Sequence, residues 1–442
     1  MSSSSSAFDF LHALHALPAI APSALSLLFA LALLLGLVCK FWLSSRQIRH
    51  VARHRDAVPA PFDATVPLAA HQRAADYTIA RSRHGLLALA FNAGVLLGWT
   101  LLGGLDALNG WLIDWLLPQG PMVYQLGLLI AFALIGGLLD LPWELYSTFR
   151  IEQHFGFNRM SWQLYLADTA KGLLVGALIG LPIAALILWL MGAAGPYWWL
   201  WAWAAWMGFN LLILVLYPTV IAPLFNKFEP LPEDPYGGLR PRIESLMQRC
   251  GFAAKGLFVM DGSRRSAHGN AYFTGFGPAK RVVFFDTLLA RLSGPEVEAV
   301  LAHELGHFKH KHVLKRVLKM FALSLAGFAL LGWLSGQTGF YLAFSVRPNM
   351  AAPNDALALL LFMLAVPVFG FFFTPLASRS SRKDEFQADA YACVQASGPD
   401  LAAALLKLHE DNAGTLTPDP VYSRFYYSHP PVSERLAAIR AR

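Results

Sequence analysis

Seven apolar segments, each long enough to cross a lipid bilayer as one helix, constrain this sequence more than any other feature. A helix needs about 20 predominantly apolar residues to span the hydrocarbon core of a bilayer. Charged residues make up only 14% of the chain, against about 25% in soluble domains. The sequence therefore predicts a mostly α-helical, polytopic membrane protein with about seven transmembrane helices. They are expected near residues 21–43, 85–107, 122–147, 168–193, 197–224, 315–336 and 355–377.

The spacing of these segments divides the chain into four parts. Residues 1–225 would hold an N-terminal tail and five transmembrane helices, and 226–314 the largest soluble part. Residues 315–377 would add two transmembrane helices, and 378–442 a C-terminal helical part.

The soluble part reads as a small α+β domain. Two short runs rich in Val and Phe, at 256–260 and 281–285, predict strands. Ser293 is followed by Gly, Pro and Glu296, a capping-box pattern with Pro in the first turn. A helix is therefore expected to begin just after Ser293.

Basic residues alternate between the connections that join the apolar segments. The connection 44–84, expected as a loop, is rich in arginine, 107–121 carries no Lys or Arg, and 148–167 is basic again. By the positive-inside rule, the N-terminus lies outside, and 225–314 and the C-terminal part lie on the cytoplasmic side. The membrane would be a bacterial inner membrane or the endoplasmic reticulum. The net charge of +7 is explained by basic loops that face the lipid bilayer, and no nucleic-acid partner is expected.

A short histidine motif, HELGH at residues 303–307, lies on the helix that begins after Ser293. Residues four apart lie on one face of a helix, so His303 and His307 can both reach a single metal ion. Glu304 lies beside that ion, where it can take a proton from a water molecule. This pattern is typical of zinc peptidases.

A catalytic zinc usually takes three protein ligands, so one more is required. Glu385 and Asp389, four residues apart, are the best candidates. Glu385 would bind the Zn²⁺, and Asp389 would accept a hydrogen bond from a ligand histidine. The alternative is an ordinary charge pair on a solvated helix. His310 and His312 are expected on a hydrated, basic helix surface.

Several separate stretches give the chain a specific resemblance. With these stretches and HELGH, the chain resembles the type I CAAX prenyl endopeptidases, which are integral-membrane zinc metalloproteases of the gluzincin group. The resemblance extends from about the third apolar segment to the C-terminus. The stretches that carry it are 141–149, 151–159, 221–228, 269–275, 381–389 and 429–436.

The resemblance implies more than the spacing does. It implies seven helices around a chamber, one Zn²⁺ per chain, and a peptide or protein substrate, prenylated or not. In such a protein Asn270, Ala271 and Tyr272 would lie on an edge strand that aligns the substrate backbone. His429 would stabilise the oxyanion, and Arg435 would orient the substrate or Asp389.

The sequence thus predicts an integral-membrane zinc endopeptidase with Glu304 and His429 as catalytic residues. Three alternatives stay open. One is a membrane quality-control metalloprotease that cuts non-prenylated proteins. Another is a transporter whose metal site is structural, and the third is a catalytically dead scaffold.

Overall fold

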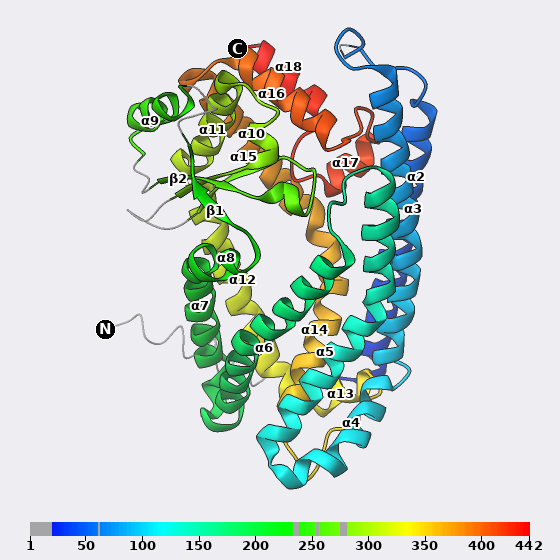
Figure 1. Cartoon of the computed structure of the whole chain (residues 1–442). Helices are drawn as coiled ribbons and strands as arrows, with labels where there is room; N and C mark the ends of the chain where they lie inside the picture. The colour runs from blue at the N-terminus through cyan, green and yellow to red at the C-terminus, as the bar shows by residue number, and fades with distance from the viewer. Residues whose placement is uncertain (1–19, 61, 233–237, 253–255, 275–280) are drawn as a thin grey trace, which may run out of the picture.

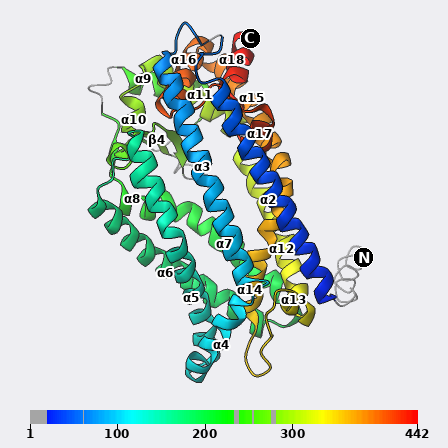
Figure 2. The same ribbon diagram turned by 90° about the vertical axis from the view of Figure 1, so that its right-hand side faces the viewer.

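The computed structural model describes residues 20–60, 62–232, 238–252, 256–274 and 281–442. Six helices in these ranges are long and apolar enough to cross a membrane, and a bent helix pair adds a seventh. The prediction of about seven spans is confirmed. Figures 1 and 2 show an elongated bundle, with the sheet and the C-terminal helices gathered at one end.

The spanning helices expose leucine side chains, such as Leu178 and Leu323, as a bilayer requires. They are α2 (Pro22–Arg53), α3 (Leu68–Trp99) with α4 (Gly104–Leu116), α5 (Pro121–Tyr146), α6 (Trp162–Ala193), α7 (Trp198–Leu216), α12 (His312–Ser335) and α14 (Asp355–Gly370). Short turns extend several of them: η1 (Leu117–Gln119), η2 (Ser147–Glu152), η3 (Gly195–Tyr197), η4 (Tyr217–Ile221), α8 (Ala222–Phe225) and η7 (Phe371–Phe373). The small helix α13 (Thr338–Ala343) lies with α4 at the end far from the sheet (Figure 1).

The second apolar segment differs from the straight span predicted at 85–107. Helix α3 ends at Trp99 and meets α4 at an angle of 53°. Gly103 adopts a left-handed conformation with φ of 79°. A Cβ added to Gly104 would lie 2.5 Å from the carbonyl oxygen of Gly98, so the bend requires glycine there.

The connection 44–84, expected as a loop, is largely helical. Helix α2 continues to Arg53, and α3 begins at Leu68. Ala74 and Tyr77 on this polar half of α3 are buried against Ile151 and Phe157. Tertiary packing therefore extends the helix well beyond its apolar part.

A four-stranded sheet has the order β1-β2-β4-β3. The strands are β1 (Phe228–Pro230), β2 (Gly256–Met260), β3 (Ala271–Thr274) and β4 (Arg281–Phe285), so both predicted strands are confirmed. Strands β2 and β4 are parallel, with Leu257 opposite Val282, and β3 pairs antiparallel to β4. Strand β3 consequently lies at an edge of the sheet.

Helices pack on this sheet and bury a second core, separate from the core of the membrane bundle. Ile243, Phe284 and Leu301 are among its fully buried side chains. The elements of this part are α9 (Leu239–Arg249), η5 (Gly262–Arg264), α10 (Asp286–Leu289), α11 (Gly294–Lys309), α15 (Thr374–Gln395), α16 (Gly398–Asp411), α17 (Pro420–Tyr426) and α18 (Val432–Arg440).

Candidate active site

Helix α11 carries HELGH and begins as its sequence predicts. The backbone N–H of Ser293 donates to Glu296 Oε2 at 2.7 Å, which closes the predicted capping box. His303 and His307 lie one turn apart on the helix, and their rings are 4.9 Å apart. The capping box fixes the residue at which α11 begins, and the two imidazoles lie on one face of this helix.

Helix α15 packs against α11 at unusually close range. A Cβ added to Gly306 would lie 2.8 Å from the Cα atom of Ala388 and 3.2 Å from the Cβ atom of Tyr391. Gly306, the glycine inside the motif, therefore allows α11 and α15 to pack closely. It lets α15 approach until Glu385 faces the two histidines.

Three side chains converge where the two helices meet. His303 Nε2 and His307 Nε2 each lie 3.4 Å from a carboxylate oxygen of Glu385. The two Nε2 atoms are 3.2 Å apart, and all ligand atoms of the group lie within 4.8 Å of one another. The Oε2 atom of Glu385 is buried and accepts no hydrogen bond from the described residues. A buried carboxylate whose two oxygens face two imidazole nitrogens fits a divalent cation.

Asp389 lies one turn beyond Glu385 and holds His303 in place. His303 Nδ1 is 2.8 Å from Asp389 Oδ1. The buried Arg435 donates to the same carboxylate from Nε at 2.9 Å and from a terminal nitrogen at 2.6 Å. Of the two partners expected for Arg435, the structure places Asp389 beside it.

His312 lies in a different place from the one that the sequence predicted. It was expected with His310 on a hydrated surface, yet only His310 is exposed, and His312 is fully buried. His312 Nδ1 lies 3.0 Å from His307 Nδ1, and His312 Nε2 lies 3.0 Å from Gln387 Oε1. Sequence reasoning missed both His312 and Gln387.

Burial and neighbouring charges give the site residues different proton affinities. Burial disfavours the charged form of His303, but the carboxylates of Asp389 and Glu385 outweigh it and raise the pKa of His303 to about 9. Burial and the nearby His303 lower the pKa of His307 to about 4. Burial raises the pKa of Glu304, which makes no hydrogen bond to another described residue. A carboxylate whose pKa is raised in this way is a stronger base than an exposed glutamate.

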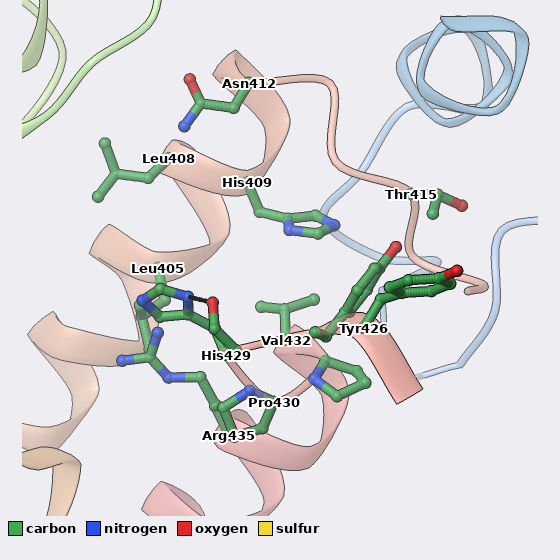
Figure 3. A pocket seen from close by; sticks show the side chains of 13 residues that line it. Leu405, Leu408, His409, Asn412, Thr415, Tyr426, His429, Pro430, Val432 and Arg435 are labelled. Carbon is green, nitrogen blue, oxygen red and sulfur yellow. Dashed lines mark hydrogen bonds between the residues drawn. The ribbon is translucent and has the colours of Figure 1, made fainter. Parts of the chain in front are cut away.

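His429 approaches the same group from the C-terminal part. Its Nε2 atom lies 3.4 Å from Glu385 Oε1, and its side chain is 65% exposed. His429 and Arg435 line one side of a cavity of about 500 Å³, with Thr415 across from them (Figure 3). Burial lowers the pKa of His429. The cavity therefore adjoins the cluster through His429 and Arg435.

Asn270, Ala271 and Tyr272 lie at and just before the edge strand β3. The side chain of Asn270 accepts a hydrogen bond from the N–H of Ala271 at 2.8 Å. Strand β3 contacts helix α11. In the described ranges, no hydrogen bond joins these residues to the histidines.

Comparison with known proteins identifies this arrangement. Residues 47–227 match the model of the CAAX prenyl protease N-terminal part with five membrane helices, and 235–442 match peptidase family M48. The chain is 37% identical over 323 residues to CAAX prenyl protease 1 homolog of Arabidopsis thaliana, covering 73% of this chain and 74% of that protein. The chain belongs to the CAAX prenyl protease 1 family.

Other members of the CAAX prenyl protease 1 family agree. CAAX prenyl protease 1 of Saccharomyces cerevisiae is 38% identical over 315 residues, covering 68% of this chain and 69% of that protein. The crystal structure of S. mikatae Ste24p superposes with a TM-score of 0.87 at 29% identity, over 96% of this chain and all of that one.

Family membership establishes the class of function. The chain is a multi-pass membrane metalloendopeptidase that acts on peptide or protein substrates, and it requires a metal ion. The alternative of a transporter with a structural metal site is thereby set aside.

Proposed function

We propose that His303, His307 and Glu385 bind one Zn²⁺ and that the chain hydrolyses peptide bonds beside it. The observation that carries this proposal is the buried carboxylate of Glu385, whose Oε2 atom has no hydrogen-bond partner among the described residues and whose two oxygens each face one imidazole of the motif. Two histidines and one glutamate are a common ligand set of catalytic zinc. Zinc in such a site acts as a Lewis acid that polarises a carbonyl and activates water.

The residues around the ion have separate roles in this proposal. Glu304 takes a proton from the attacking water and passes it to the leaving amine. His429 donates a hydrogen bond to the oxyanion, and its exposed position beside Glu385 supports this role. Asp389 fixes the ring of His303, and Arg435 fixes Asp389.

A substrate would bind as an added strand along β3. The free edge of this strand offers backbone groups to an extended peptide, as in other complexes that form by strand addition. Asn270, Ala271 and Tyr272 are the residues proposed to contact it. The names of the relatives, CAAX prenyl proteases, support a prenylated substrate. A quality-control protease for non-prenylated substrates is the competing proposal.

The catalytic end is proposed to lie on the cytoplasmic side, with the N-terminus outside. The arginines of the connection 44–84 lie at the same end of the bundle as α11 and α15, which supports this orientation (Figure 1). The net charge of +7 is thereby assigned to the membrane surface and not to nucleic acid.

One experiment tests metal, mechanism and substrate together. The purified protein is stripped of metal, reloaded with Zn²⁺, and assayed against matched farnesylated and plain peptides. We expect zinc to restore hydrolysis of the farnesylated peptide, and Glu304→Gln to bind zinc while losing about 10²–10⁴-fold in rate.

Glu244→Gln, at an exposed position of α9, is the matched control and should retain full activity. Equal rates for wild type and Glu304→Gln would refute the proposed mechanism. Equal cleavage of both peptides would favour the quality-control alternative.

A further inference from the structure

Helix α15 carries a basic face just before it reaches the metal-site residues. Two adjoining cavities open along it, of about 490 Å³ and about 420 Å³, and both are lined by Arg379 and Arg382. Arg424 from α17 adds a third cation to the first cavity, and Lys383 adds one to the second. Arg442, near the C-terminus, also lines the second cavity, so five cations line two cavities that share Arg379 and Arg382; the two cavities together are called the hollow.

These cations lack acidic partners. Arg379, Lys383 and Arg424 make no hydrogen bond or ion pair with any residue that the structure describes, and Arg379 and Lys383 are exposed. Arg382 donates only to neutral carbonyl oxygens, of Tyr427 at 2.7 Å and of Ser423 at 3.4 Å. Glu434 lines the first cavity, but its carboxylate forms no ion pair with them. The hollow thus has an uncompensated positive charge that favours an anion.

The position of the hollow along the helix matches the surface of a bilayer. Phe373 and Leu376, immediately before it, are 65% and 66% exposed, as side chains facing lipid are. Lys319 on α12 donates to Ser380 at 3.2 Å, which places another cation at the same level. Lipid-facing apolar surface therefore changes to cationic surface within one helical turn. Leu376 also lines the first cavity, next to Arg379.

We propose that this hollow binds the phosphate of an anionic phospholipid headgroup at the membrane surface. Guanidinium groups bind phosphate oxygens through paired hydrogen bonds, and basic pockets at the ends of membrane helices are suited to such headgroups. The exposed Phe373 and Leu376 provide the apolar surface along which an acyl chain lies.

The site is connected to the catalytic residues through Arg382. It lies three residues before Glu385 on α15, and its bond to the Tyr427 carbonyl fixes the segment that leads to His429. A bound headgroup would stabilise this connection, so we expect anionic lipid to raise peptidase activity. This second effect, unlike lipid binding itself, rests on the function proposed above.

The test uses the full-length chain in nanodiscs of phosphatidylcholine, with or without a minority of phosphatidylglycerol. Bound phosphatidylglycerol is counted by native mass spectrometry and by lipid retained after exchange into detergent. The triple variant Arg379→Gln, Lys383→Gln, Arg424→Gln should reduce retention about 10-fold or more. The control Arg49→Gln, Arg53→Gln, Arg83→Gln removes the same charge from exposed arginines outside the hollow, and its retention should stay at the wild-type level.

Three results would overturn the proposal. Equal losses in both triple variants would show only general attraction to a charged surface. Unchanged retention in the first variant would exclude the hollow. Thermal stabilisation by inorganic phosphate in neutral nanodiscs, abolished by the same variant, would show a free-anion site and not a lipid site. Because retention is measured without substrate, these results are separate from a failure of the peptidase assay.

Discussion

The Nδ1 atom of His307 lies 3.0 Å from the Nδ1 atom of His312, and this contact determines which nitrogen of His307 is free to bind a metal. His312 Nε2 lies 3.0 Å from Gln387 Oε1, with the Asp384 carboxylate nearby at 3.6 Å, so this nitrogen carries a proton and donates it to Gln387. His312 Nδ1 is then an acceptor, and His307 must donate from Nδ1. The lone pair of His307 Nε2 consequently points to Glu385.

Replacing His312 should therefore weaken metal binding without removing a ligand. We expect His312→Leu to lower the affinity for Zn²⁺ by about 10–100-fold, because His307 loses the partner that fixes its tautomer. The measurement is a competition titration with a chromophoric chelator. His310→Leu, at the exposed neighbouring histidine, is the control. Unchanged affinity in a folded His312→Leu protein would show that the contact has no such role.

The close approach of α11 and α15 at Gly306 gives a second prediction. A Cβ there would press on the backbone of α15, so Gly306→Ala should separate Glu385 from the two histidines. We expect a loss of about 1–3 kcal/mol in the free energy of unfolding, together with weaker metal binding.

Gly176→Ala is the matched control, because a Cβ there would meet no atom within 4 Å among the described residues. It should be neutral or slightly stabilising. Thermal unfolding and zinc titration of both variants check the prediction, which fails if the two behave alike.

Asp389 should contribute to stability as well as to metal binding. Asp389→Asn removes the carboxylate that Arg435 contacts most closely and leaves the buried guanidinium only the Glu385 carboxylate at 3.9 Å; breaking a buried pair in this way typically costs about 3–5 kcal/mol. The thermal midpoint of the metal-free protein should fall clearly. Asp114→Asn, at an exposed position of α4, should leave the midpoint unchanged. Equal midpoints for the two variants would contradict the prediction.

The metal-free protein should lose stability as the pH is raised from neutral to mildly alkaline. The pKa of His303 is about 9 in the folded chain, above its ordinary value of 6.5, so folding favours the protonated ring. The resulting stabilisation, up to about 3 kcal/mol, is complete below about pH 6.5 and is lost as the pH rises through about 9. Thermal unfolding at several pH values measures it, and His303→Asn should flatten the profile between these limits.

The affinity for metal should change in the opposite direction over the same pH range. A metal ion needs the unprotonated ring of His303, so binding must release this proton below about pH 9. His307, with a pKa of about 4, is already neutral there. Zinc affinity should therefore rise with pH up to about 9. An affinity independent of pH would contradict the assigned protonation of His303.

The sequence was most informative where one chemical requirement determines a residue pattern. Apolar length predicted the spans, and β-branched and aromatic runs predicted β2 and β4 at their observed bounds. The motif 303–307 needed only helical spacing to place both histidines on one face. Glu385 was predicted because a catalytic zinc needs a third protein ligand, and the structure places Glu385 beside His303 and His307.

The sequence was least informative where tertiary contacts override local pattern. The polar half of α3 has the hydropathy of a loop. It is helical because it packs against Ile151 and Phe157, which are far away in the sequence, so the local pattern does not reveal this burial. His312 resembles an exposed residue in a basic run, because the turn at Lys311, with φ of 57°, directs it inward. Local sequence carries no signal for either effect.

Helices α14 and α15 follow one another as a single 41-residue candidate span from Asp355 to Gln395, which begins at the end of the bundle far from the sheet and carries Glu385 near its other end. A thinner or thicker bilayer changes the tilt of such a span, and a change of tilt moves the carboxylate relative to α11. Membrane thickness is thus mechanically linked to the coordination geometry. The same polypeptide should therefore work at different rates in short-chain and long-chain lipids, even when every reagent in solution is identical.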